Sequence, residues 1–103
     1  MKANTSFGEF IRSMRQKRGE PLRVIASEAD IDSTLLSKLE RGERFPTADQ
    51  IAKFAKLFRV PEQELKGRVI ADKVVSEYDD DTVTRHAVQF LKERVTPYRT
   101  NSK

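Results

Sequence analysis

The stretch LRVIASEADIDSTLLSKLERG, residues Leu22–Gly42, predicts two short helices joined by a tight turn. Ile25 and Ala29 recur at helical spacing, so they share one face of the first helix. Leu36 and Leu39 do the same on the second helix. Both helices therefore have an apolar side that can pack inward, and this helix pair organises the rest of the chain.

The turn between these helices has its own sequence signals. Asp30 falls at a corner that usually requires left-handed backbone, where Asp is a tolerable substitute for Gly. Asp32 offers a side-chain oxygen as the N-cap of the second helix. Ala26 lies where the two helices would cross, and a larger side chain there would push them apart.

The outward face of the second helix is short and polar. Its hydrogen-bonding side chains are Ser33, Thr34, Ser37 and Lys38. Lys can donate to the O6 and N7 acceptors of guanine, whereas Ser and Thr hydroxyls can serve several bases. A helix with an apolar back and such a front, preceded by a bracing helix, suits a DNA major groove.

The helix pair resembles the helix-turn-helix of the lambda-repressor/Cro superfamily, also called the XRE family. The resemblance covers roughly residues 6–66, and its further matches are Phe10, Ile11 and Arg15 in the first helix, Leu39-Glu40-Arg41-Gly42, and Pro46. It implies an all-α fold with a lambda-repressor-like five-helix DNA-binding domain. The resemblance also implies that the partner is double-stranded DNA and that no cofactor is needed. Beyond residue 66 the family no longer dictates the structure, and the additional C-terminal helix or helices for dimerisation are expected from the residues themselves, as argued below.

The resemblance assigns roles to individual residues. Ser33, Thr34 and Lys38 fall where family members contact base edges, and Ser37 lies beside them. The arginine that matches Arg15 pairs in the family with the glutamate that matches Glu40, as a structural ion pair. This last expectation concerns stability, since breaking such a buried pair costs about 3–5 kcal/mol.

The expected phosphate contacts are Arg23, Arg41 and Arg44. Arg41 and Arg44 would stand beside the DNA backbone in the loop after the second helix. The sequence departs from the family at Leu22, where a phosphate-binding Gln is common. Either Arg23 takes over that contact, or this edge of the footprint is weakened.

Charge and composition agree with a polyanionic partner without requiring one. The net charge is +4, and residues 1–68 hold 14 Lys and Arg against 10 Asp and Glu, whereas residues 69–103 hold 6 against 6. The absence of cysteine fits a reducing cytoplasm. Neither a signal peptide nor a membrane-spanning run is expected.

The remaining segments divide the chain into three predicted parts: residues 1–66 as the helix-turn-helix domain, 67–95 as a helical dimerisation extension, and 96–103 as a flexible tail. Helical stripes predict one long helix from residue 62 to about 77 and another over 83–95. Their apolar residues exceed what a five-helix domain needs, so we expect a dimer interface at Val69, Val74, Tyr78, Phe90 and Leu91. The alternative is that these helices fold back onto the core of their own protomer.

These observations favour a homodimeric, sequence-specific DNA-binding regulator, most simply a repressor that occludes a palindromic operator. An antitoxin-type regulator that holds a protein partner is the alternative, and ligand sensing stays open. An enzyme is not expected, because the chain has no Cys, a single histidine, His86, and no acidic or basic cluster suited to a pocket. The acidic run at residues 79–81 is interpreted as a helix-initiating turn rather than a metal site.

Overall fold

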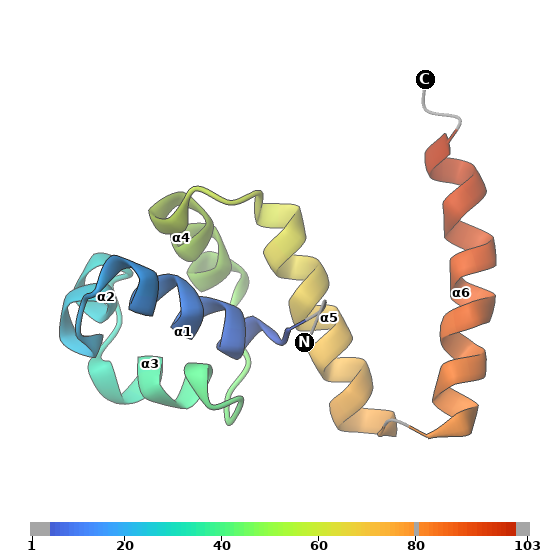
Figure 1. Ribbon diagram of the computed structural model, residues 1–103, viewed down its shortest axis with the longest axis horizontal. Coiled ribbons are helices and arrows are strands. Elements are labelled where there is room, and N and C mark those ends of the chain that lie inside the picture. The colour runs from blue at the N-terminus through green and yellow to red at the C-terminus, as the bar shows by residue number, and fades with distance from the viewer. Residues whose placement is uncertain (1–4, 80, 101–103) are drawn as a thin grey trace. The chain divides into compact units, whose positions relative to one another are not determined.

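The computed structural model describes residues 5–79 and 81–100, and the side chains as far as residue 95. This part of the chain contains six helices and no strand (Figure 1): α1 (Phe7–Arg18), α2 (Leu22–Glu28), α3 (Ser33–Glu40), α4 (Ala48–Phe58), α5 (Glu62–Tyr78) and α6 (Thr82–Thr100). The predicted all-α fold is therefore confirmed. The chain divides into two compact units, Met1–Asp72 and Lys73–Lys103.

The ends of the first helices follow their local sequence. At the start of α1 the Ser6 hydroxyl accepts from the Glu9 backbone N–H at 3.1 Å, and the Glu9 carboxylate accepts from the Ser6 N–H at 3.3 Å. This reciprocal capping box satisfies two backbone donors that the helix cannot pair itself. Asp30 has the left-handed backbone expected of it (φ 63°), but so does Arg59 (φ 59°), where α4 ends without a glycine.

A single hydrophobic core holds the first unit together. The rings of Phe7 and Phe54 meet edge to face, with centroids 5.8 Å apart and planes at 76°. The largest fully buried side chains are Phe7, Phe54, Ile11, Ile25, Leu36, Leu39 and Leu65. Since these come from α1 to α5, each helix of the unit is anchored by its own apolar stripe.

One contact in this core is made by backbone alone. A Cβ placed on Gly8 would lie 2.3 Å from the carbonyl oxygen of Leu39 and 2.6 Å from that of Glu40. The start of α1 therefore lies directly against the C-terminal end of α3. Only a residue without a side chain fits there, and the sequence alone did not single this glycine out.

The N-terminal half of α5 belongs to the same core. Val69 is only 4% exposed, so its assignment to a dimer interface was wrong. Val69 follows Leu65 by one helical turn, which places both on the side of α5 that faces the core. On that side Asp72 accepts from the Phe7 backbone N–H at 2.9 Å, and partial burial raises the pKa of this carboxyl. Arg68 donates to the Thr5 carbonyl at 2.7 Å.

Two predicted boundaries differ from the structure. The division after residue 66 falls inside α5, because Gly67 stays helical and the compact unit continues to Asp72. The helical backbone of α6 runs on to Thr100, through residues 96–100, which were assigned to the flexible tail. A helix without an apolar stripe loses burial but keeps its backbone hydrogen bonds. The extent of the stripe therefore predicted a shorter helix than the structure contains. Residues 101–103 lie outside the described part.

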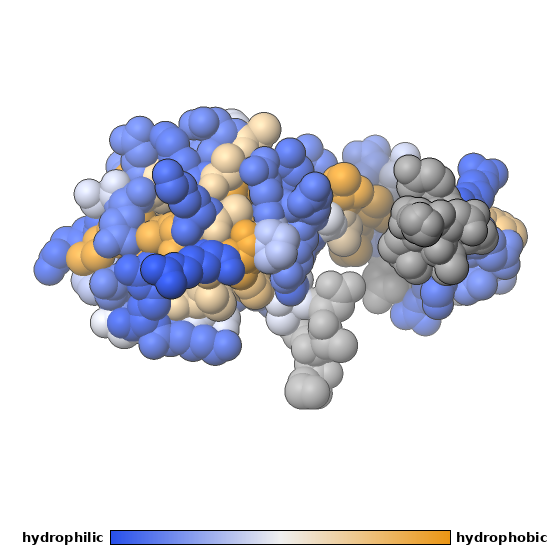
Figure 2. Space-filling model, turned by 90° about the horizontal axis from the view of Figure 1, so that it is seen from above, coloured by the Kyte–Doolittle hydropathy of each residue, from blue (hydrophilic) through white to orange (hydrophobic). Residues whose placement is uncertain are grey.

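Helices α5 and α6 also expose apolar residues. Figure 2 shows hydrophobic residues among hydrophilic ones at the surface. The exposed large apolar side chains of the two last helices are Ile70, Val75, Tyr78, Val83, Val88, Phe90, Leu91 and Val95. At the start of α6 the Asp81 carboxylate accepts from the Thr84 N–H at 2.9 Å, and this bond lowers the pKa of Asp81. An acid in that position acts as a helix cap, as the acidic run predicts. Among the described residues, no helix combines the length and hydrophobicity needed to cross a membrane.

Candidate DNA-binding surface

The second helix of the pair, α3, is held by its apolar back. Leu36 and Leu39 are 0% and 1% exposed, and α3 packs against both α1 and α2. Leu35 is half-buried and also packs against the core. At the start of the helix the Asp32 carboxylate accepts from the Leu35 N–H at 2.7 Å, as the expected N-cap. The backbone of α3 is thus fixed at its start and along its length.

The front of α3 carries the predicted base-reading residues. Thr34 is exposed, whereas Ser33, Ser37 and Lys38 are half-buried. Residues four apart lie above one another on a helix, so Ser33 and Ser37 form one row and Thr34 and Lys38 the next. Arg41 continues the first row, since its backbone is still helical at the C-cap position. The structure therefore brings Arg41, expected in the loop, onto the front of α3.

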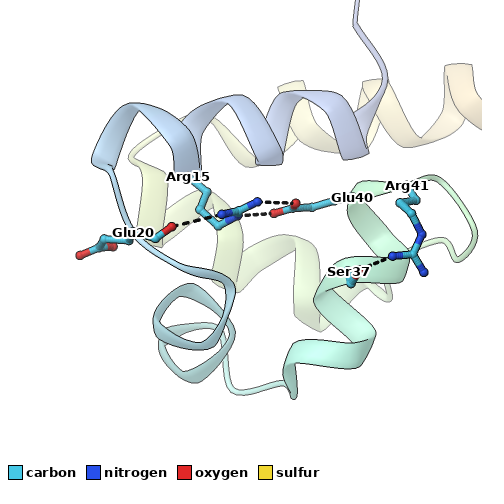
Figure 3. Close-up of polar contacts among 5 residues, drawn as sticks. All are labelled: Arg15, Glu20, Ser37, Glu40 and Arg41. Atoms are coloured by element: carbon cyan, nitrogen blue, oxygen red, sulfur yellow. Dashed lines mark hydrogen bonds and ion pairs between the residues drawn. The ribbon is translucent and has the colours of Figure 1, made fainter.

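An ion pair ties the C-terminal end of α3 to α1. Arg15 Nε lies 2.8 Å from Glu40 Oε2, and Arg15 donates a second hydrogen bond to Glu40 Oε1 at 3.0 Å (Figure 3). A third bond reaches the Glu20 carbonyl at 3.2 Å. The side chains of Arg15 and Glu40 are only 15% and 5% exposed, and the bond to Glu40 raises the pKa of Arg15. The ion pair that the resemblance implied is present and bidentate.

A second bidentate pair lies at the end of the front row. Arg41 Nε donates to Glu43 Oε2 at 2.7 Å and Arg41 Nη2 to Glu43 Oε1 at 3.2 Å. Arg41 also donates to the Ser37 hydroxyl (Figure 3). The Glu43 bond raises the pKa of Arg41, and the same bond lowers the pKa of Glu43. Glu43 was assigned no role from the sequence, although it lies only two residues from Arg41, a predicted phosphate ligand.

Arg23 belongs to α2 and lies near the N-terminal end of α3, opposite the end that carries Arg41. It lines a shallow hollow at the helix-turn-helix corner, which measures about 550 Å³ and is also lined by Ala26, Ser27, Asp30, Ile31, Asp32 and Ser33. The carboxylate of Asp30 lies 3.0 Å from the ammonium group of Lys53. Leu22 is half-buried against the core, so it offers no polar group here. Arg23 and Arg41 thus mark the two ends of α3.

Arg44 belongs to neither end of this arrangement. It is exposed in the loop between α3 and α4, three residues beyond the C-cap. The loop leaves α3 through Gly42, whose φ of 77° is the left-handed value expected of a C-terminal cap.

His86, the single histidine, is exposed on α6.

Comparison with known proteins fits this geometry. A family described as a helix-turn-helix domain matches residues 6–66, the segment that contains α1 to α4 and the start of α5. The chain belongs to the XRE family of helix-turn-helix regulators. The matched segment contains the helix pair α2 and α3 and the Arg15–Glu40 ion pair. The relatives described below are named as transcriptional regulators.

Relatives of this XRE-family chain carry the same description. An uncharacterized HTH-type transcriptional regulator of Mycobacterium tuberculosis is 32% identical over 83 residues, which cover 79% of this chain and 59% of the relative. The HTH-type transcriptional regulator ImmR of Bacillus subtilis is 30% identical over 94 residues, 88% of this chain and 72% of the relative. The chain thus spans about three-fifths of the mycobacterial protein. No solved structure matches significantly.

Proposed function

We propose that the protein is a sequence-specific regulator that binds double-stranded DNA as a homodimer and represses transcription from a palindromic operator. The observation that carries this proposal is the front of α3. It presents short hydrogen-bonding side chains on a helix whose two ends are fixed by the Asp32 cap and the Arg15–Glu40 pair. Helices presented in this way dock in the major groove, which a helix fits and where each base pair is distinguishable.

The contacts divide into two kinds. Base edges are contacted by Ser33, Thr34, Ser37 and Lys38. Because three of these side chains are short, α3 must lie deep in the major groove for them to reach the bases. Phosphate contacts hold α3 at this depth. They are made by Arg23 and Arg41 near the two ends of the helix and by Arg44 in the following loop. Phosphate contacts carry affinity and salt dependence, whereas base contacts carry sequence preference.

Substitution of Lys38 and Arg44 separates these kinds of contact. Lys38→Ala is expected to change the preferred base at one position and to cost about 1–3 kcal/mol on the preferred site. Arg44→Ala is expected to weaken binding to all sequences alike and to reduce the salt slope by about 1. Titrations of both variants against specific and scrambled duplexes at several salt concentrations measure this. Equal, sequence-blind losses from both would contradict the assignment.

Dimerisation is assigned to the exposed apolar faces of the C-terminal helices. Ile70, Val74 and Tyr78 follow one another at intervals of four along α5, on the side away from Val69. Ile70 and Tyr78 are 63% and 64% exposed, and Val74 is half-buried. With Phe90 and Leu91 of α6, these residues form the interface that we propose in place of the one containing Val69. A dimer supplies two copies of α3 for two half-sites about 34 Å apart.

Leu91→Lys tests this interface. The leucine is 58% exposed, so the change leaves the core of the first unit intact but places a charge in the proposed dimer contact. We expect sedimentation equilibrium to show a shift from dimer to monomer. The matched control is Gln89→Lys, which adds the same charge on the opposite side of α6. A monomeric unmodified protein, or equal behaviour of both variants, would refute the interface.

Repression follows from occupancy, since a dimer bound across a promoter excludes RNA polymerase. The same exposed apolar faces favour a second candidate, a regulator of antitoxin type whose C-terminal helices hold a different protein. Copurification of a stoichiometric partner that Leu91→Lys releases, with no homodimer in its absence, would support that candidate.

A further inference from the structure

We propose that Glu43 competes with DNA phosphate for Arg41: its carboxylate holds the guanidinium in the free protein and must be displaced before Arg41 binds the DNA backbone. This inference rests on the proposed DNA-binding function and adds a residue that limits it. Arg41 is therefore a conditional phosphate ligand, unlike an arginine without a local acid.

The geometry places the carboxylate where a phosphate would bind. Arg41 uses its Nε and Nη2 groups on the two oxygens of Glu43, at 2.7 and 3.2 Å, which is the fork arrangement that arginine also offers to phosphate. Its Nη1 group donates to Ser37. Three of the five N–H groups are thus engaged, and the two oxygens of Glu43 occupy the Nε–Nη2 edge, one of the two edges that can bind an anion bidentately.

The loop backbone holds Glu43 in this position. The Gly42 N–H donates to the Leu39 carbonyl at 3.2 Å, and the Glu43 N–H donates to the Lys38 carbonyl at 2.9 Å. These two bonds close the C-terminal end of α3 as a Schellman-type cap. The backbone of Glu43 is consequently fixed beside Arg41 by the same cap that ends the reading helix.

The energetics make the pair reversible. Both side chains are 53% exposed, and pairs this exposed contribute little to stability because water solvates both ions. A DNA phosphate can therefore displace the carboxylate, but the displaced Glu43 then lies beside a polyanion. The Arg41–Glu43 pair as a whole also carries no net charge, so its approach releases few of the counterions that are condensed on DNA. Both effects reduce affinity for every sequence alike.

Glu43→Gln tests the proposal in the full chain. We expect affinity for specific and scrambled duplexes to rise together, by about fivefold at low salt. The slope of log K against log salt should steepen by about 0.9, equivalent to one additional phosphate contact. The matched control is Glu62→Gln, which removes an acid of similar exposure from the Lys66 pair on α5 and should change neither quantity.

A double-mutant cycle with Arg41→Ala separates competition from simple repulsion. Competition predicts that the gain from Glu43→Gln largely disappears when Arg41 is absent. An equal gain in both backgrounds would overturn the proposal in favour of general charge repulsion. A loss of affinity in Glu43→Gln would overturn it too, because Glu43 would then be a brace that presents Arg41 to the DNA. Absence of DNA binding by the unmodified protein and every variant would instead refute the proposed function, and this inference with it.

Discussion

Gly8→Ala is expected to lower the free energy of unfolding by about 3 kcal/mol, at the upper end of the range for overpacked cores. The added methyl group would meet the carbonyl oxygens of Leu39 and Glu40 at 2.3 and 2.6 Å. Backbone atoms cannot rotate away as a flexible side chain can, so α1 and α3 must separate. Thermal unfolding followed by circular dichroism should show a drop in Tm of more than about 10 °C.

Gly67→Ala is the matched control. Gly67 is also helical, but a Cβ there would meet nothing within 4 Å. Alanine is the better helix former, so this variant should gain about 0.5–1 kcal/mol. Gly8→Ala and Gly67→Ala make the same chemical change and should move Tm in opposite directions. Equal stability of the two variants would show that α1 does not approach α3 as closely as the structure places it.

Glu40→Gln is expected to cost about 3 kcal/mol of stability, because it leaves the Arg15 guanidinium poorly compensated. Denaturant unfolding measures the loss, which should be accompanied by weaker DNA binding, since the pair fixes the end of α3. The paired change Arg15→Met with Glu40→Leu should recover much of the loss, as apolar replacements of a buried ion pair often do.

The control for this pair is Glu62→Gln, which breaks the exposed Glu62–Lys66 pair of α5. Its two side chains are 44% and 48% exposed, so the change should stay within about 0.5 kcal/mol. If Glu40→Gln were as mild as Glu62→Gln, the Arg15–Glu40 pair would not brace α3.

Local sequence signals predicted the helix ends and the apolar backs of the helix pair. The left-handed Asp30 and the Asp32 cap both involve residues close in sequence, where spacing fixes geometry. The Arg15–Glu40 pair joins distant residues, and its prediction came from the family resemblance rather than from spacing.

Tertiary packing decided what the sequence did not predict. Gly8 gave no signal, because the need for a glycine arises only when α3 lies against it. Val69 was misplaced because α5 has apolar residues on two sides, and a stripe does not say which side meets the core. Glu43 and Arg41 were both visible in the loop, but their bidentate contact depends on the turn through Gly42.

The central claim is that α3 reads DNA sequence in a symmetric pair. Selection from a random pool of double-stranded DNA, repeated at several salt concentrations, tests it most directly. We expect an enriched palindrome whose half-sites are about one helical turn, roughly 34 Å, apart, with an affinity that falls steeply as salt rises. Weak binding to all sequences, with no motif enriched at any salt concentration, would contradict it.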